Sequence, residues 1–380
     1  MRKGWEYKKL GEVCCPKSKI QRATKCFGGS DEILYIDISS IDNSVQEVNN
    51  ITSFTMSNAP SRAQQKVEYG DIIVSTVRPN LKNVAFIKQH DSNLVASSGF
   101  CVLRTTDDIE RNYLFRYITS DIFTQHLMKL TTGANYPAVR DLDVRDSTIP
   151  LPPKSTQLAI VSELDKINEL IRLKKEQLKD FDNLAQSLFY EMFGDPVENE
   201  KGWEVKKLIE VSSLINGRAY KQNELLSEGK YKVLRVGNFF TNSNFYYSNL
   251  ELEDEKYCYK GDLLFAWSAS FGAFIWDEDK TIFHYHIWRV LFDKAILDIH
   301  YYQYLLNTMT SFFMNDVHGI GMVHLTKSGM EQYELPLPPL SLQRLFAQRI
   351  EQIEREKSEV QKSIQDLETL LASRMQYWFE

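Results

Sequence analysis

The polar residues that could carry chemistry in this chain gather in loops rather than in a compact catalytic motif. They are of the types that contact phosphates and base edges in nucleic-acid complexes. In the first half, the candidates are Lys19, Arg22, Lys25, Thr76, Arg78, Asn80, Asn135, Tyr136 and Arg140. In the second half, they are Arg218, Tyr220, Lys221, Arg235, Asn238, Ser268, Ser270, His318 and His324. Because any exposed loop has a similar composition, these residues indicate DNA contact only weakly.

Motifs that would mark an enzyme do not occur in the sequence. It has no GxxxxGK[ST] phosphate loop, no GxGxxG, no GxSxG and no HExxH. It also lacks the Asn or Asp followed by two prolines and an aromatic residue that an amino-methyltransferase needs in its pocket. We therefore expect no catalytic residue and no cofactor in this chain. A divergent methyltransferase or nuclease is the alternative, and an assay of methyl transfer by the purified chain separates the two.

His284 and His286, with Tyr285 between them, are the candidates for metal ligands. On a strand, their imidazoles would point to one face, as zinc ligands can. No cysteine or carboxylate clearly completes the set, and the five cysteines include no CxxC pair. We therefore expect no metal site, and we assign the two histidines to aromatic packing or a polar contact. The cysteine pattern also disfavours disulfides and favours a reducing cytosol, so a cytoplasmic location is expected.

The chain contains the same pattern twice. GWEYKKL at 4–10 returns as GWEVKKL at 202–208, and IPLPP at 149–153 returns as LPLPP at 335–339. A glutamine follows each proline pair at the same distance, as Gln157 and Gln343. A repeat of this length is too long for a solenoid and indicates a domain duplication.

Each proline-rich motif is followed by about forty residues without glycine or proline, which predicts a long helix. The apolar residues in these segments recur at coiled-coil spacing, with Lys174 and Lys357 as exceptions at seam positions. The helix-pairing residues are Leu164, Ile167, Ile171, Leu178 and Phe181, with Ile350, Ile353, Val360, Ile364 and Leu367. We expect an antiparallel pair related by an approximate two-fold axis; the alternative is that each helix lies on its own domain.

The segments before the helices alternate short β-rich runs with Gly, Asn, Ser and Asp turns, and one amphipathic helix is predicted to close each, over Asn112–Lys129 and Ile299–Asn315. The predicted fold class is α+β: two mixed α/β domains joined by two long helices that pair as an antiparallel coiled coil. The predicted ranges are 1–150 and 196–337 for the two domains, and 151–195 and 338–380 for the two helical spacers.

Charge and hydropathy limit the possible partners. The formal net charge is −6, although residues 1–150 carry 19 Lys and Arg against 17 Asp and Glu. If the chain binds DNA, it must use a local basic face, and we expect a partner to supply further positive charge. No run of eighteen apolar residues occurs, so a membrane span is not expected.

These motifs resemble the specificity subunit of type I restriction–modification systems over nearly the whole chain. The resemblance rests on the two GWExKKL starts, on VRPN at 77–80, on YPAV at 136–139 and on the two proline-rich helix entries. YKVLRVGN at 231–238 and HYHIW at 284–288 also fit the family pattern.

The resemblance implies a DNA-specificity subunit without catalysis. Each domain is a target recognition domain that reads one half-site of a bipartite, asymmetric duplex target, and the helices are spacers. The family pattern further implies two methyltransferase subunits and additional restriction subunits as partners, which bind S-adenosylmethionine, ATP and magnesium and carry out adenine methylation and restriction. A coiled-coil adaptor or a solitary DNA-binding regulator remains as an alternative, which the neighbouring genes would distinguish.

Overall fold

The computed structural model describes residues 4–133, 136–241, 243–268, 270–315 and 325–380. Three predicted contact residues, Asn135, His318 and His324, lie outside these ranges. The chain divides into a first unit, Met1–Lys174 with Ser363–Glu380, and a second unit, Lys175–Lys362. Each unit therefore contains one half of the duplicated sequence and a part of both long helices.

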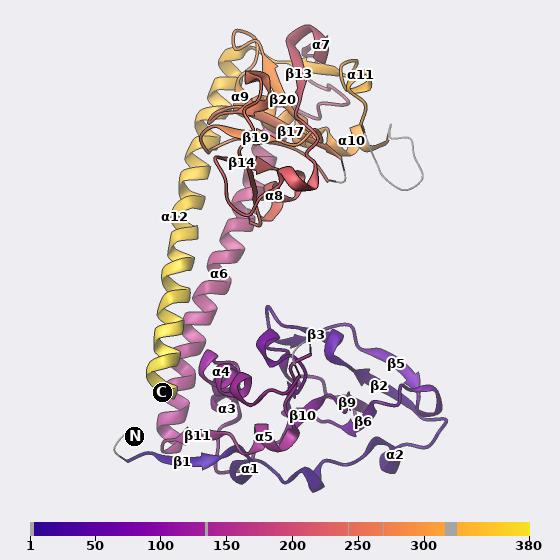
Figure 1. Ribbon diagram of the computed structural model, residues 1–380, viewed down its shortest axis with the longest axis vertical. Helices are drawn as coiled ribbons and strands as arrows, with labels where there is room; N and C mark the ends of the chain where they lie inside the picture. The colour runs from indigo at the N-terminus through magenta and orange to yellow at the C-terminus, as the bar shows by residue number, and fades with distance from the viewer. Residues whose placement is uncertain (1–3, 134–135, 242, 269, 316–324) are drawn as a thin grey trace. The chain divides into compact units, whose positions relative to one another are not determined.

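The first unit contains two main sheets with short helices beside them (Figure 1). One has the order β5-β2-β9-β6, in which β2 and β9 run parallel; the other, β10-β7-β8, is antiparallel. All four residues of β7 are buried, as its run of β-branched side chains favours. The strands are β1 (Glu6–Lys9), β2 (Glu32–Ile36), β3 (Ile41–Asp42), β4 (Glu47–Val48), β5 (Thr52–Thr55), β6 (Ala63–Lys66), β7 (Ile72–Ser75), β8 (Val84–Phe86), β9 (Leu94–Ser97), β10 (Phe100–Leu103) and β11 (Thr148–Leu151). The helices besides the long pair are α1 (Leu10–Val13), α2 (Ala23–Cys26), α3 (Arg111–Ile118), α4 (Asp121–Leu130) and α5 (Asp141–Arg145).

The second unit repeats this arrangement. Its sheets have the orders β15-β14-β19-β16, with β14 and β19 parallel, and β13-β20-β17-β18, which is antiparallel. The strands are β12 (Glu204–Lys207), β13 (Ser212–Asn216), β14 (Tyr231–Leu234), β15 (Tyr246–Ser248), β16 (Tyr257–Cys258), β17 (Leu263–Ser268), β18 (Ser270–Ile275), β19 (Thr281–Phe283), β20 (Ile287–Phe292) and β21 (Glu334–Leu337). The short helices are α7 (Leu208–Val211), α8 (Val236–Thr241), α9 (Ile299–Thr308), α10 (Thr310–Asn315) and α11 (Lys327–Met330).

The two repeated sequence motifs form one structural element in each unit. In the first unit, β1 pairs with β11 so that Tyr7 faces Pro150; in the second, β12 pairs with β21 so that Val205 faces Pro336. Proline cannot donate to a strand ladder, and it is tolerated here because the ladder has only two strands. The repeated motifs are therefore the place where the start of each domain meets the strand that leads into its long helix.

The long helices are α6 (Lys154–Phe193) and α12 (Leu340–Phe379), with 40 residues each. Within the second unit, Asp182 of α6 bonds to Lys357 of α12 at 2.7 Å. Further along α6, Phe189 packs on Phe346, which comes earlier in α12, with ring centres 5.7 Å apart. The order of the partners is reversed, so the helices pair antiparallel.

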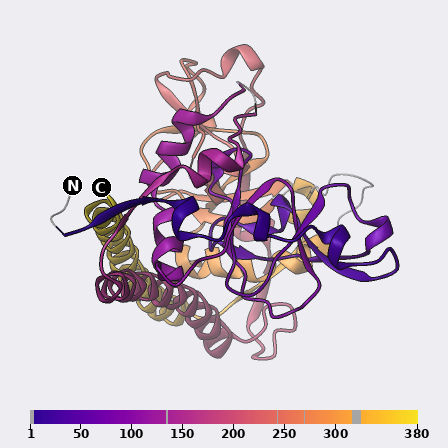
Figure 2. The same ribbon diagram turned by 90° about the horizontal axis from the view of Figure 1, so that it is seen from below.

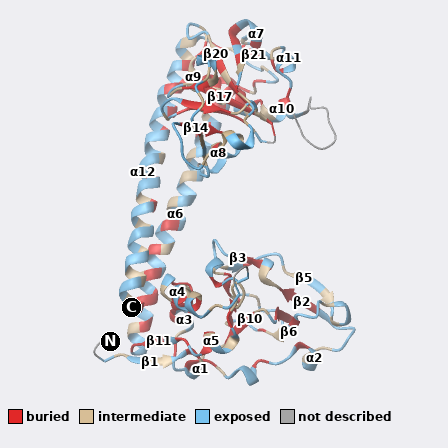
Figure 3. Ribbon diagram, in the orientation of Figure 1, coloured by how far each residue is buried: buried red, intermediate tan, exposed pale blue. Residues whose placement is uncertain are grey.

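In the first unit, Glu163 of α6 accepts hydrogen bonds from Arg374 and from the Trp378 indole of α12, the latter at 3.2 Å. The rings of Trp5 and Trp378 are stacked with centres 6.3 Å apart. The segment that leads into β1 therefore lies beside this end of α12 (Figure 2). Buried and exposed positions alternate along both helices (Figure 3). The predicted seam residues all occupy buried or half-buried positions: Leu164, Ile167, Ile171, Leu178, Phe181, Ile350, Ile353, Val360, Ile364 and Leu367.

The prediction of a single helix closing each domain is wrong. In the first unit, the helix is broken at Ser120, which is extended and whose hydroxyl accepts a hydrogen bond from the Phe123 N–H as the cap of α4. In the second unit, Met309 ends α9 and a separate α10 follows. Serine competes with the helix for backbone groups, so a capping residue inside an apolar-periodic run divides it.

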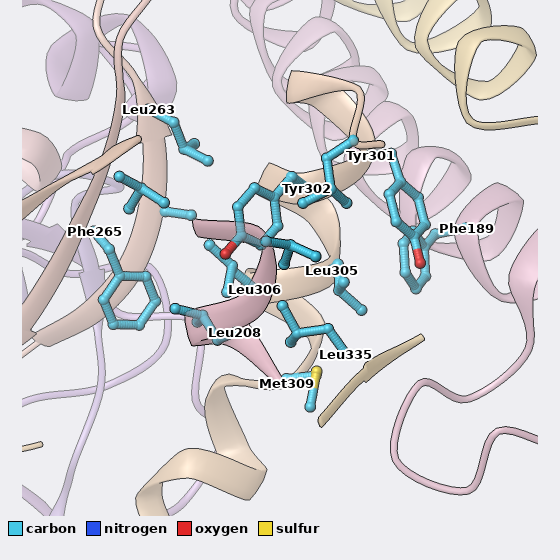
Figure 4. Close-up of a cluster of buried hydrophobic side chains, with 14 of the residues drawn as sticks. Phe189, Leu208, Leu263, Phe265, Tyr301, Tyr302, Leu305, Leu306, Met309 and Leu335 are labelled. Carbon is cyan, nitrogen blue, oxygen red and sulfur yellow. The ribbon is translucent and has the colours of Figure 1, made fainter. Parts of the chain in front are cut away.

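The core of the second unit joins its sheet to the helical pair. Phe189 of α6, Tyr301 and Leu305 of α9, Leu335 of β21 and Phe265 of β17 belong to one buried cluster (Figure 4). The hydroxyl of Tyr301 donates to the carbonyl of Pro336 at 2.8 Å. The buried Gln343 at the start of α12 has an equivalent in Gln157 of α6, which makes the same kind of contact in the first unit.

Candidate nucleic-acid interface

Arg78 and Tyr136, predicted from two separate loops, lie together in the first unit. The guanidinium carbon of Arg78 is 4.5 Å from the centre of the Tyr136 ring. Both side chains are exposed, Tyr136 to 68%. Within the described part of the chain, Arg78 has no carboxylate partner. A stacked guanidinium keeps its in-plane N–H donors, which suit bidentate hydrogen bonds to the edge of a guanine.

Backbone pairing fixes this arrangement. Val77 forms an antiparallel bridge with Ala138, and the N–H of Arg78 donates to the carbonyl of Pro137 at 2.7 Å. Arg78 itself has a φ of 49°, in the left-handed region that residues other than Gly, Asn and Asp rarely adopt. Strained backbone of this kind persists where the surroundings fix it, and it is common at functional sites.

The other predicted contact residues near Arg78 and Tyr136 differ in whether their polar groups are free to bind a ligand. Asn80 is exposed in the short 3-10 helix Pro79–Leu81. The hydroxyl of Thr76 donates to the carbonyl of Gly99 at 2.8 Å, so it has a structural role. Arg140 is exposed, but the Nε and Nη2 groups of its guanidinium donate to the carboxylate of Asp143. The Arg140 guanidinium is therefore already bound to a carboxylate, whereas Arg78 has no carboxylate partner among the described residues.

Lys19, Arg22 and Lys25 form a second predicted group in the first unit. All three are exposed, on the 3-10 helix Lys17–Lys19 and on or next to α2. Arg22 also bridges to Gln65 through its backbone, which places this segment beside β6. The structure therefore brings the three basic side chains onto one exposed segment.

In the second unit, Arg235 lines a pocket of about 340 Å³. The pocket is also lined by Asn244, His284 and His286. Arg235 is exposed, and its guanidinium carbon lies 5.4 Å from the ring centre of Tyr246. The second unit thus also presents an arginine next to a tyrosine, although the surroundings differ.

The prediction that His284 and His286 share one face of a strand is wrong. They lie in the connection from β19 to β20, where a hydrogen bond from the Ile287 N–H to the His284 carbonyl (3.0 Å) closes a turn. The turn nevertheless brings the two rings together, with centres 4.8 Å apart. Burial, with the neighbouring His286 and Arg235, lowers the pKa of His284 to about 4, so this imidazole is neutral at pH 7. Among the described residues, no group of three or more His, Cys, Asp or Glu could hold a metal ion.

Other predicted residues of the second unit have internal partners. Arg218 binds both carboxylate oxygens of Glu224 at 2.8 and 2.9 Å, and Lys221 bonds to the same carboxylate through its backbone. The hydroxyl of Tyr220 donates to the carbonyl of Phe283 at 3.3 Å. These contacts stabilise the loop after β13 and leave Arg218 less able to bind a ligand than Arg235.

Asn238 and Ser268 are buried, whereas Ser270 is exposed on β18. The side chain of Asn238 accepts a hydrogen bond from the Arg235 N–H and donates to the Ser243 carbonyl, at 2.8 and 2.7 Å. Its role is thus to shape the turn that presents Arg235. The predicted contact set did not include His284, His286 or Asn244 as pocket residues, because their proximity depends on the pairing of strands distant in sequence.

Comparison with known proteins places these features in a family. The family described as the type I restriction modification DNA specificity domain matches residues 2–180 and again residues 200–369. The chain belongs to this family. Its two matched ranges follow the internal duplication; the first contains Arg78 and the second contains Arg235.

Full-length relatives of the specificity-domain family are similar along most of their sequence. The type I restriction enzyme MjaIX specificity subunit of Methanocaldococcus jannaschii is 23% identical over 378 residues, covering 90% of this chain and 85% of that protein. The MjaVIII specificity subunit of the same organism is 22% identical, covering 68% of this chain and 69% of that protein.

Solved structures have the same fold. A chain from a type I R-M system, described in terms of complex assembly and conformational transition, matches with a TM-score of 0.69 and 26% identity, covering 99% of this chain and 97% of that chain. The S subunit of the type I system from M. genitalium has a TM-score of 0.52 and 14% identity, covering 99% and 96%, which supports the fold alone. In the described part of this chain, no helix has the length and apolar character needed to cross a membrane.

Proposed function

We propose that this chain is the DNA sequence-specificity subunit of a type I restriction–modification complex. Each unit reads one half of a bipartite duplex target, and the partner subunits carry out the adenine methylation and the restriction. The observation that carries the proposal is that the two units have a similar arrangement of strands but expose different side chains for contact with DNA. The first exposes Arg78 stacked on Tyr136, and the second exposes Arg235 beside a pocket. Different contact groups at different places on the two repeated folds suit an asymmetric target.

The partners are proposed to be two methyltransferase subunits together with restriction subunits. The charge of the chain supports this, because a net charge of −6 is unfavourable for holding a DNA backbone without help. S-adenosylmethionine, ATP and magnesium are assigned to those partners. The names of the relatives, all specificity subunits, support a role without catalysis.

A binding experiment tests the proposal. The purified chain is mixed with labelled duplexes alone and with its methyltransferase partner, and methylome sequencing of the host supplies the target motif. We expect weak binding by the chain alone and sequence-specific binding by the assembled complex. If the assembled complex bound all duplexes alike, the proposal would be wrong. Methyl transfer by the chain without a partner would instead support the enzyme alternative.

A further inference from the structure

At one equivalent position, directly after the first of the two parallel strands, the two units have side chains of opposite charge. In the first unit, the parallel strands β2 and β9 are followed by Asp37 and by the turn that ends at Gly99. In the second unit, the parallel strands β14 and β19 are followed by Arg235 and by the turn that ends at His286.

In both units, the segment after the first strand of each pair begins with the same kind of side-chain hydrogen bond, although it continues as the 3-10 helix Ile38–Ser40 in the first unit and as α8 in the second. The N–H of Asp37 donates to the hydroxyl of Ser40 at 3.1 Å, and the N–H of Arg235 donates to the side-chain oxygen of Asn238 at 2.8 Å. In the first unit, the Asp37 carboxylate turns inward and accepts hydrogen bonds from the backbone of this turn. In the second unit, the side chain at the same position is a cation exposed beside the pocket.

The pocket in the second unit has the composition of an anion site. The described lining residues include no Asp or Glu, and Arg235 supplies a permanent positive charge. Thr241, Ser243 and Asn244 contribute further polar side chains. His284 and His286 complete the wall with imidazoles that can donate hydrogen bonds.

We propose that this pocket binds a backbone phosphate of the DNA next to the half-site read by the second unit. The concave shape of the pocket favours a phosphate over a base edge. Phosphates protrude from a duplex, whereas base edges lie at the floor of a groove. A concave basic pocket can receive the former without deforming the DNA. The corresponding place in the first unit has Asp37, so this anchor belongs to the second half-site only.

The inference rests on the proposed function, and one variant tests the phosphate site separately from that function. Arg235→Ala is made in the full-length chain, which is assembled with its methyltransferase partner. Dissociation constants are measured over a range of salt concentrations for the target duplex and for an unrelated duplex. We expect both affinities to fall by a similar factor, about three- to tenfold, and the salt slope to fall by about one. Arg235→Lys should keep most of the slope, and Lys260→Ala is the matched control for loss of a charge elsewhere in the unit.

A second measurement locates the phosphate. Single methylphosphonate linkages, which lack the charge, are placed along each strand of the target duplex. We expect one position beside the second half-site to weaken binding by the wild-type complex and to have no further effect on the Arg235→Ala complex.

Two results would overturn the inference while leaving the proposed function intact. In one, Arg235→Ala changes the preference at a single base pair and leaves binding to the unrelated duplex unchanged, so that Arg235 reads a base. In the other, the variant changes neither affinity nor slope, so that the pocket does not contact DNA. Failure of the proposed function is recognised separately, because the wild-type complex would then show no preference for the target duplex.

Discussion

The side-chain oxygen of Gln343 accepts a hydrogen bond from the backbone N–H of Asp298 at 2.8 Å. The amide nitrogen of the same side chain donates to the carbonyls of Pro338 and Ile296, and the residue is fully buried. It therefore ties the start of α12 to the residue that caps α9. Gln157 repeats this relationship in the first unit, where it accepts from the Glu110 N–H at 2.8 Å.

Gln343→Met is predicted to destabilise the second unit. The change leaves a buried N–H and two buried carbonyls without their partner, which costs about 2–3 kcal/mol of unfolding free energy. The measurement is chemical denaturation of the full chain. Gln352→Met, at an exposed position of the same helix, is the matched control and should change stability by less than about 0.5 kcal/mol. Equal effects of the two substitutions would contradict the structural role of Gln343.

Arg78→Asn is predicted to relax specificity in the first half-site. Asparagine tolerates the left-handed backbone at this position, so the substitution removes the guanidinium without adding strain. Loss of a bidentate contact costs about 1–3 kcal/mol of discrimination at one base pair. Competition binding by the assembled complex, with duplexes changed one base pair at a time, measures the effect.

Arg140→Ala is the control for that experiment, because the Arg140 guanidinium is already bound to Asp143. We expect it to leave base preference unchanged. A loss of specificity from Arg140→Ala equal to that from Arg78→Asn would show that pairing with a carboxylate does not decide which arginine reads DNA.

The stability of the second unit is predicted to fall in mild acid through His284. The pKa of this group is lowered to about 4 by burial and by His286 and Arg235, whereas its unperturbed value is 6.5. The unfolded chain therefore binds a proton that the folded chain does not, so this contribution is complete above pH 6.5 and is lost as the pH falls towards 4. Between pH 7 and pH 5 the loss is at most about 2 kcal/mol, because solvent screens the partly exposed ring.

Denaturation at several pH values, compared between the wild type and His284→Gln, tests this dependence. The variant should show a shallower decline between pH 7 and pH 5. His300→Gln, a histidine near Glu351 on α12, controls for general effects of removing an imidazole. Identical pH profiles of the wild type and His284→Gln would rule out the assigned pKa.

The two long helices are predicted to set the spacing between the half-sites. Four residues inserted after Lys174, with a matching insertion after Lys362, lengthen each helix by about 6 Å, or nearly two base-pair steps. We expect methylome sequencing to show unchanged half-sites separated by a spacer one or two base pairs longer. A changed half-site with an unchanged spacer would contradict this role.

The sequence alone determined the features that depend on neighbouring residues. The three-four spacing of Leu164, Ile167 and Ile171 predicted a helical seam, because side chains at this spacing fall on one face of a helix. The paired motifs at Gly4 and Gly202 indicate the duplication, and a sequence without catalytic motifs is not typical of an enzyme. Periodicity did not reveal the break at Ser120, because one capping side chain ends a helix without changing the apolar pattern.

Only the tertiary structure decided which polar residues are available to a ligand. Arg78, Arg140, Arg218 and Arg235 are alike as loop arginines in the sequence, yet Arg140 and Arg218 bind carboxylates. Arg78 and Arg235 have no carboxylate partner among the described residues, and each lies against a tyrosine from another segment. The pocket beside Arg235 also requires the parallel pairing of β14 with β19, which brings together residues far apart in the chain. Local pattern fixes which face of a helix or strand is buried, but long-range pairing determines which side chains meet.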